Sequence, residues 1–248
     1  MRKIMLHIPH SSLFIPNEYL NDYLINQNLL KEYNIEMSDI HTDKIFEYDK
    51  FHSVRFNCSR LFCDVEKFTN PELEPFAKYG MGPIYTNVYD GTLIRSLNEN
   101  KSSLILNNFY EAHHQQLDSY TEETILGGND LLVIDCHSYL DKVASKLFGD
   151  SDFPDLCIGF DEKYKDEYVI DIIKSIFEAN GYSVMVNFPF QGALVPNIAF
   201  SNDEIADKLK SVMIELNKRT YLDSSNQIDN KKYEKLRKVI LSIYEKLV

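Results

Sequence analysis

Acidic and imidazole side chains accompany short apolar runs at three places in the sequence. The run "LLVID" ends in Asp135 and is followed by His137, and the first run, "KIMLHI", contains His7 and is followed by His10. A third run, "SVMIEL", carries Glu215. Zinc hydrolases bind their ion through three His, Asp or Glu ligands, leave one position for water, and use a separate carboxylate as general base. These residue types therefore have the composition of a metal site, of the kind that zinc hydrolases use.

A further carboxylate is needed to complete such a ligand set. Asp39 and Asp43 stand four residues apart in "SDIHTDKIF". A helix through this stretch would place both on one face with a single turn between them, so either could be the third ligand.

Charged residues interrupt an apolar segment at "CSRLFCDVEKF", where Arg60, Asp64 and Glu66 stand among aromatic, aliphatic and thiol side chains. Arg60 could form a bidentate clamp on a carboxylate, although a surface position is the commonest fate of arginine. Arg219, shortly after Glu215, is open to the same two interpretations. Either guanidinium could hold an anionic substrate.

Strands and helices must bring these residues together. We expect strands over residues 3–8, 51–57, 131–135, 156–160, 182–187 and 211–216. We expect helices within residues 38–48, 104–120, 161–181 and 230–248. The intervening stretch 66–103 contains several Pro and Gly residues and reads as an irregular loop.

Strands that alternate with helices predict one α/β domain over residues 1–248, with a mixed, mostly parallel sheet covered by helices on both faces. Ligands of such sheets bind at the carboxyl ends of the strands. If the three strands that carry the imidazoles and carboxylates are neighbours, their polar residues meet along one edge.

Composition limits the possible partners. The formal net charge of −12 repels nucleic acid and anionic membranes, although a local basic pocket can still hold a small anion. No apolar run reaches membrane-spanning length, and the N-terminus lacks a secretory signal pattern. The four cysteines show no C-x-x-C spacing, which is typical of a reducing compartment. We therefore expect a cytoplasmic protein.

Nine sequence blocks, taken together and in order, resemble the signature blocks of the N-formylglutamate amidohydrolases. The resemblance covers about residue 5 to residue 222, and the blocks read "HIPHSS", "SDIHTDKIF", "VRFNCSRLFCDVEKF", "GMGPIYT", "FYEAHHQQL", "VIDCHSY", "PDLCIG", "VNFPFQGALVP" and "IELNKRTYL". The resemblance implies a zinc-dependent hydrolase that splits N-formyl-L-glutamate into formate and glutamate, a late step of histidine degradation. It also implies an α/β fold similar to that of zinc carboxypeptidases and aspartoacylase.

The resemblance implies a ligand set for one zinc ion per chain. His10, Asp39 and His137 match the family's metal ligands. His7 is a possible substitute for His10, and Asp43 stands close enough in sequence to replace Asp39.

The resemblance also implies roles for residues around the metal. Glu215 is expected to be the general base, and Arg60 and Arg219 to bind the substrate's carboxylates, with one arginine stabilising the developing oxyanion. The remaining residues expected to contact the substrate are His114, Asn187 and Gly192. Ser12 and Ala193 depart from the family's usual glycines, and both changes concern the substrate pocket rather than the metal.

Three alternatives fit the same residues. An amidase acting on another small anionic acyl-amino acid would use every metal residue in the same way. A zinc carboxypeptidase acting on peptides would need a wide open cleft. A binding protein that kept the fold but lost catalysis is disfavoured, because His10, His137 and Glu215 are all present.

Overall fold

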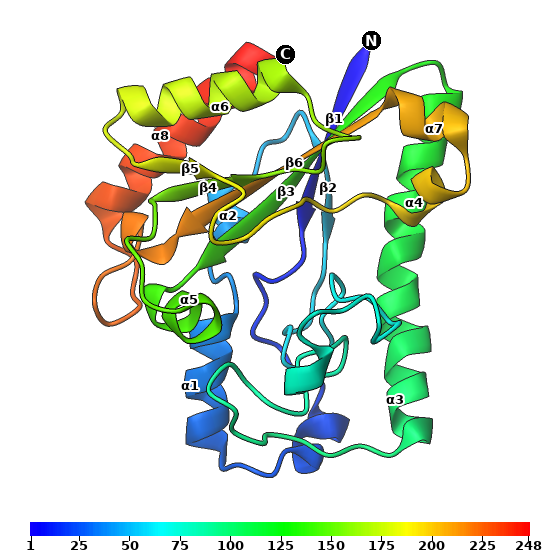
Figure 1. Ribbon diagram of the computed structural model, residues 1–248, viewed down its shortest axis with the longest axis vertical. Helices are drawn as coiled ribbons and strands as arrows, with labels where there is room; N and C mark the ends of the chain where they lie inside the picture. Colours follow the sequence, from blue (N-terminus) through cyan, green and yellow to red (C-terminus); the bar gives the residue numbers. More distant parts are fainter.

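A six-stranded sheet with the strand order β2-β1-β3-β6-β4-β5 forms the centre of the computed structural model, which describes residues 1–248 (Figure 1). The strands are β1 (Arg2–Ile8), β2 (His52–Arg55), β3 (Asp130–Tyr139), β4 (Leu156–Gly159), β5 (Val184–Val186) and β6 (Leu209–Asn217). Strands β2, β1, β3 and β6 are parallel to one another, β4 is antiparallel to β6, and β5 is parallel to β4. The prediction of a mixed, mostly parallel sheet is confirmed, and all six expected strands are present.

The central strand β3 is buried along almost its whole length. Nine of its ten residues, from Leu131 to Tyr139, are buried. Because both faces of the sheet are covered, such a strand reads as a continuous apolar run until it reaches the edge where ligands bind. The change from Ile134 to Asp135 marks that edge in the sequence.

Helices cover both faces of the sheet, as predicted. Helices α2 (Thr42–Ile45), α6 (Glu167–Ala179) and α8 (Asn230–Leu247) share one apolar cluster with the face that presents Leu6 and Ile134. Helices α4 (Glu111–Leu126) and α7 (Asp203–Lys208) pack on the other face, against Met5 and Val133. No helix combines the length and the apolar character needed to cross a membrane.

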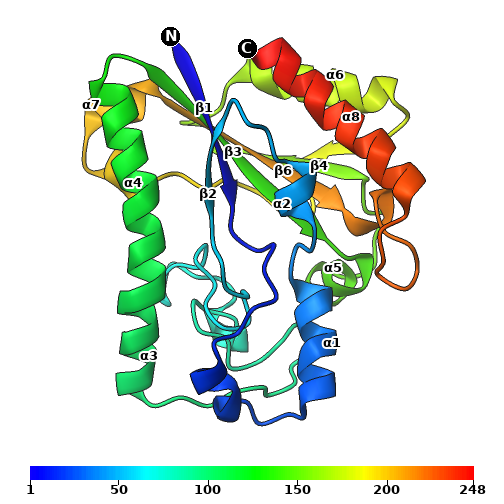
Figure 2. The ribbon, with the colours of Figure 1, turned by 180° about the vertical axis from the view of Figure 1, so that it is seen from behind.

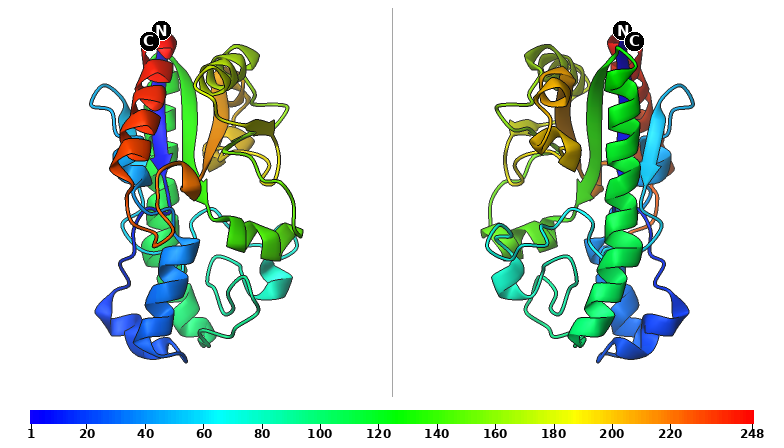
Figure 3. Two further views of the ribbon diagram at one scale, coloured as in Figure 1. Left: turned by 90° about the vertical axis from the view of Figure 1, so that its left-hand side faces the viewer. Right: turned by 90° about the vertical axis from the view of Figure 1, so that its right-hand side faces the viewer.

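The carboxyl ends of the parallel strands face a region without sheet structure. Figures 1 and 2 show α1 (Gln27–Met37), α5 (Asp141–Phe148) and the loop over residues 56–98 below these strand ends, with both chain termini at the opposite end of the molecule. The side views of Figure 3 show the same division. A second apolar cluster, which includes Leu61, Phe62 and Tyr85, holds this lower region together.

The expected loop and the helix that follows it are both found, with shifted bounds. Residues 66–98 are irregular apart from the 3-10 helix η2 (Ala77–Tyr79). The helix expected over 104–120 is longer: α3 (Glu99–Ile105) continues through the π-helical turn η3 (Leu106–Tyr110) into α4. The remaining short elements are the 3-10 helices η1 (Asn17–Asp22), η4 (Asn197–Phe200) and η5 (Lys218–Thr220).

The helix expected over residues 38–48 is wrong except for the single turn of α2. Ser38 ends α1 instead of starting a helix, because its backbone N–H donates to Asn34 O. His41 then adopts a left-handed backbone conformation, with φ of 71°. The N–H of Asp39 donates to His10 O at 2.8 Å, so a tertiary contact fixes this turn against the end of β1.

Candidate active site and metal centre

Strands β1, β3 and β6 are neighbours, so the polar residues at their carboxyl ends meet at one edge. His7 pairs in register with Asp135, and His137 pairs in register with Glu215. Residues paired in this way in a parallel sheet point to the same face, and residues two apart on one strand do so as well. His7, Asp135, His137 and Glu215 therefore share one face of the sheet.

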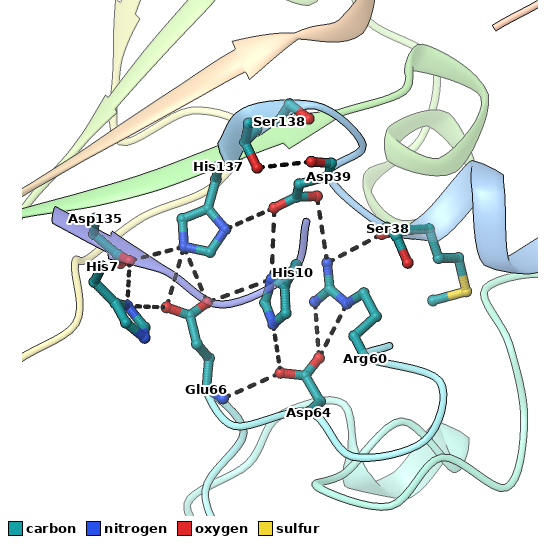
Figure 4. Close-up of polar contacts among 12 residues, drawn as sticks. His7, His10, Ser38, Asp39, Arg60, Asp64, Glu66, Asp135, His137 and Ser138 are labelled. Carbon is teal, nitrogen blue, oxygen red and sulfur yellow. Dashed lines mark hydrogen bonds and ion pairs between the residues drawn. The ribbon is translucent and has the colours of Figure 1, made fainter. Parts of the chain in front are cut away.

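His10, Asp39 and His137 form what we call the first ligand set. Their nearest ligand atoms all lie within 4.8 Å of one another, and all three side chains are buried (Figure 4). Asp39 Oδ2 lies 3.5 Å from His10 Nδ1 and 3.0 Å from His137 Nδ1. A tetrahedral zinc ion with bonds of 2.0–2.2 Å holds its ligand atoms about 3.3 Å apart, so these separations fit such an ion.

His10 is oriented so that one ring nitrogen is free to bind a metal. Its Nε2 lies 2.9 Å from Asp64 Oδ1, which fixes the proton on that nitrogen. The other nitrogen, Nδ1, is buried and has no hydrogen-bond partner. Because buried polar atoms are normally paired, an orphaned imidazole nitrogen beside a carboxylate and a second imidazole fits a metal ligand.

His137 is oriented from its opposite side. Its Nε2 lies 3.0 Å from Asp135 Oδ1 and 3.1 Å from the Glu66 carboxylate, which turns Nδ1 toward Asp39. The other oxygen of Asp135 accepts a hydrogen bond from Leu194 N at 2.9 Å. Asp135 thus holds the ring of His137 and anchors the loop that contains Leu194.

The electrostatics of the site favour a bound cation. Burial alone would raise the pKa of Asp39, but the neighbouring imidazoles of His10 and His137 outweigh burial and hold the pKa below its usual range. Burial likewise opposes ionisation of Asp64, yet the charge of Arg60 and the contact with His10 hold its pKa well below the usual value. Asp39 and Asp64 therefore stay ionised although both are buried.

Glu215 lies beside the first ligand set without a hydrogen bond to the rest of the chain. Its side chain is buried, and burial is the main reason that its pKa is raised to about 8. The charges of Asp39 and Glu66 act in the same direction, while His137 and Arg60 oppose them. A carboxylate whose pKa lies near neutral pH is suited to proton transfer.

Arg60 reaches the same cluster from the loop after β2. Its Nε and Nη2 lie 3.1 and 2.8 Å from Asp64 Oδ2, and its Nη1 lies 3.9 Å from Asp39 Oδ1. The side chain is 19% exposed, more than the 0–1% of the two carboxylates it contacts. The structure thus places Arg60 at the site, with part of its side chain exposed.

Comparison with known proteins decides the family. The family model described as N-formylglutamate amidohydrolase matches residues 2–222. The chain belongs to the N-formylglutamate amidohydrolase family. Membership makes the protein a hydrolase of the amidohydrolase type. No curated protein matches the sequence.

Two solved structures share the fold of this family member. The crystal structure of N-formylglutamate amidohydrolase from Ralstonia eutropha superposes with a TM-score of 0.79 at 20% identity, over 98% of this chain and 92% of that one. A gene product of Agrobacterium tumefaciens superposes with a TM-score of 0.68 at 17% identity, over 99% of this chain and 91% of that one. At these identities the likeness concerns the fold, and it confirms the α/β architecture.

Arg219, expected to bind substrate, is placed differently in this N-formylglutamate amidohydrolase family member. Its guanidinium lies 3.0 Å from Asp141 and 3.0 Å from Asp155, and it also donates to Phe153 O. Its side chain is 42% exposed, and none of these partners belongs to the first ligand set. Arg219 thus pairs with two carboxylates outside the cluster, and its contacts do not bring it to the first ligand set.

His114 also faces away from the ligand set. Its Nε2 lies 2.7 Å from Val65 O, and its Nδ1 lies 3.2 Å from Asn197 Nδ2. Both ring nitrogens therefore contact the protein, and His114 holds the backbone next to Glu66; its contact with a substrate stays a prediction. Its neighbour His113 reaches the cluster instead, with Nε2 2.9 Å from His7 Nε2.

Asn187 and Gly192 shape the loop after β5. Asn187 Oδ1 accepts hydrogen bonds from Phe160 N at 3.0 Å and Gly192 N at 3.3 Å. The carbonyl of Gly192 lies 2.2 Å from where a Cβ at Gly159 would stand, so only glycine fits at position 159. The two residues thus hold the loop against the sheet on the face that carries Glu215.

Two residues of the cluster were quoted in the sequence analysis without a role. Asp64 holds His10, and Glu66 approaches three imidazoles: His137 at 3.1 Å, His7 at 3.4 Å and His10 at 3.9 Å. The feature of the sequence that points to Asp64 and Glu66 is their position as acidic residues within an otherwise apolar segment. Asp43, the alternative to Asp39, lies on α2 and does not join the residues that converge here.

Proposed function

We propose that the protein is a metal-dependent amidohydrolase that hydrolyses N-formyl-L-glutamate to formate and L-glutamate. The observation that carries the proposal is the orphaned Nδ1 of His10, fixed by Asp64 and aimed at the gap that it shares with Asp39 and His137. Family membership supports the amide bond as the target. As the resemblance implies, we assign the reaction to a late step of histidine degradation.

We assign His10, Asp39 and His137 to one zinc ion. Two imidazoles and a carboxylate are the donor set of an open catalytic zinc site, whereas magnesium and calcium prefer oxygen ligands. Bound there, zinc supplies Lewis-acid polarisation of a carbonyl and lowers the pKa of water to roughly 7. The carboxylate of Asp64 and those beside His137 keep both rings in the required tautomer.

Glu215 is assigned as the general base. Its position in β6 places it next to His137, and its carboxylate has no partner in the chain that would compete for a proton. It accepts a proton from the attacking water and returns it to the leaving nitrogen of the amide, because the same group can act first as base and then as acid. A raised pKa makes both transfers accessible near neutral pH.

Arg60 is assigned as the cation that meets the negative charge of the substrate or of the reacting carbonyl oxygen. Its guanidinium contacts Asp64 and approaches Asp39, so Arg60 is the arginine that lies at the first ligand set. A fixed cation at this point would stabilise a developing oxyanion and orient an anionic acyl-amino acid. Arg219 is left out of this assignment because its partners, Asp141 and Asp155, lie outside the first ligand set.

The substrate assignment is tested with a panel of acyl-amino acids. Formate release from N-formyl-L-glutamate is compared with formate release from N-formyl-L-leucine and acetate release from N-acetyl-L-glutamate. A kcat/KM for N-formyl-L-glutamate that exceeds the others by about 10² or more supports the proposal. Equal or higher values for another member of the panel would move the assignment to a related amidase.

A further inference from the structure

The imidazole of His137 lies between two groups of candidate ligands. Its Nδ1 faces Asp39 of the first ligand set. Its Nε2 faces what we call the second ligand set, which consists of His7, Glu66 and Asp135, and whose ligand atoms also lie within 4.8 Å of one another. Figure 4 shows this second set on the far side of the His137 ring from Asp39.

The atoms around His137 Nε2 have the spacing of a closed tetrahedral metal site. His7 Nδ1 lies 2.8 Å from Asp135 Oδ1 and 3.4 Å from Glu66 Oε1, and His137 Nε2 lies 3.0 and 3.1 Å from the same two carboxylates. Ligand atoms around zinc are about 3.3 Å apart, so movements of a few tenths of an ångström would admit an ion. Two imidazoles and two carboxylates would then complete its coordination.

The second ligand set is held rigidly by the rest of the protein. The backbone of Glu66 is fixed by its own N–H, which donates to Asp64 Oδ1 at 3.1 Å, and by the contact between His114 and Val65 O. His7 is completely buried in β1, and its Nε2 is occupied by His113, which leaves Nδ1 for the carboxylates. A metal ion would therefore meet ligands that are already in place.

The two sets compete for one residue. A neutral imidazole has a single free lone pair, so His137 can bind an ion through Nδ1 or through Nε2, but not through both. An ion in the second set would therefore remove His137 from the first set. It would also leave no open position for water, because four protein ligands close a tetrahedral site.

We propose that His7, Glu66, Asp135 and His137 Nε2 form a second divalent-cation site whose occupation inhibits the enzyme. The binding part of this inference stands on the geometry alone, and the inhibition rests on the proposed function. Excess zinc would thus abolish most of the activity that the first zinc ion supports.

The binding part is tested with Co²⁺, whose absorption spectrum reports tetrahedral coordination. The variants H10N and D39N each remove a ligand of the first set and leave the second set complete. We expect each to bind one Co²⁺ per chain with a tetrahedral spectrum, and we expect H10N/E66Q to lose this binding. Using two single variants keeps the test valid if one of them fails to fold.

The outcomes separate this inference from the proposed function. If the wild type binds Co²⁺ while H10N and D39N bind none, the second set is a hydrogen-bond network only, and the inference is overturned while the proposed function stands. If no variant and no wild-type protein binds Co²⁺, both fail. Titrating the wild type with buffered free Zn²⁺ should first raise and then lower formate release. Because Glu66 also orients His137, each protein is compared with its own maximum. E66Q should lack the decrease at high zinc, and a decrease of equal relative size in E66Q would refute the inhibitory role.

Discussion

His137 on β3 and Glu215 on β6 stand directly opposite each other in a parallel ladder, with both side chains on the same face of the sheet. The hydrogen bonds between the two strands therefore fix the separation of the expected metal ligand and the expected base. Sites built on regular elements keep their geometry better than sites built on loops. Asp39, Asp64 and Glu66, by contrast, come from turns and need tertiary contacts to hold them in place.

Replacing Glu215 with glutamine should stop catalysis without emptying the metal centre. Glutamine keeps the size of the side chain but cannot accept the proton, so kcat should fall by about 10²–10⁴. Metal content, measured by elemental analysis of the purified variant, should match that of the wild type. An E215Q variant that retains wild-type turnover would show that another group is the base.

The pH profile of the wild type should report the raised pKa of Glu215. Burial raises this pKa to about 8 in the metal-free protein, and the base acts only when ionised, so activity should rise with pH. A nearby dication favours the carboxylate, which places the rising limb of kcat/KM below pH 8 and above the ordinary value for glutamate. A profile that is flat from pH 5 to 9 would contradict the assignment.

The raised pKa of Glu215 should also make the free energy of unfolding depend on pH. A carboxyl whose pKa is raised by folding binds its proton more tightly in the folded state, so the metal-free protein should lose stability as pH rises from about 4.5 to about 8. Glutamine does not ionise, so metal-free E215Q should be more stable than the wild type at pH 8, by an amount on the order of 2 kcal/mol. Chemical denaturation of both proteins at pH 5 and pH 8 measures the difference, and equal stability at pH 8 would argue against a strained, buried charge.

The strands and the edge of the sheet could be predicted because a strand that is buried on both faces consists of consecutive apolar residues. Continuous apolar runs that end in polar residues mark β1, β3 and β6, and the meeting of His7, Asp135, His137 and Glu215 follows once these strands are neighbours. The antiparallel pairing of β4 with β6 could not be predicted, because an apolar run does not indicate the direction of the strand in the sheet.

The loop residues could not be predicted, because tertiary contacts decide their positions. Local pattern favoured a helix from Ser38, yet the hydrogen bond from Asp39 N to His10 O makes a turn there instead. His113 and His114 are adjacent on α4, and only the packing of that helix decides which ring reaches His7. Glu66 belongs to a loop, and the local sequence does not determine the path of that loop to the cluster.

Replacing Asp64 with asparagine should weaken metal binding. Asp64 fixes the ring of His10 and accepts from Arg60 and Tyr85, so its loss frees the imidazole to rotate. Loss of such a supporting carboxylate typically costs 10- to 100-fold in metal affinity. Competition with a zinc chelator measures the change in Kd.

The matched control for this experiment is Asp155→Asn, which removes a carboxylate that pairs with Arg219 outside the site. The affinity of D155N for zinc should equal that of the wild type. Equal affinities for D64N and D155N would mean that Asp64 does not orient a metal ligand.

The two arginines should differ sharply when each is replaced with lysine. Arg60→Lys loses the fork that contacts Asp64 and approaches Asp39, so kcat/KM should fall by about 10² or more. Arg219→Lys alters an exposed pair of ion contacts, which are worth about 0–1 kcal/mol, and should leave kcat/KM within about threefold of the wild type. Steady-state kinetics on N-formyl-L-glutamate decide between them, and a larger loss in R219K than in R60K would reverse the assignment.

The central claim is that a metal held by His10, Asp39 and His137 enables hydrolysis of N-formyl-L-glutamate. The most direct measurement is formate release by the purified protein before chelation, after removal of metal, and after zinc is added back, with metal content determined at each stage. We expect release to disappear with the metal and to return as about one zinc ion per chain is restored. Undiminished formate release from a protein shown to contain no metal would contradict the account.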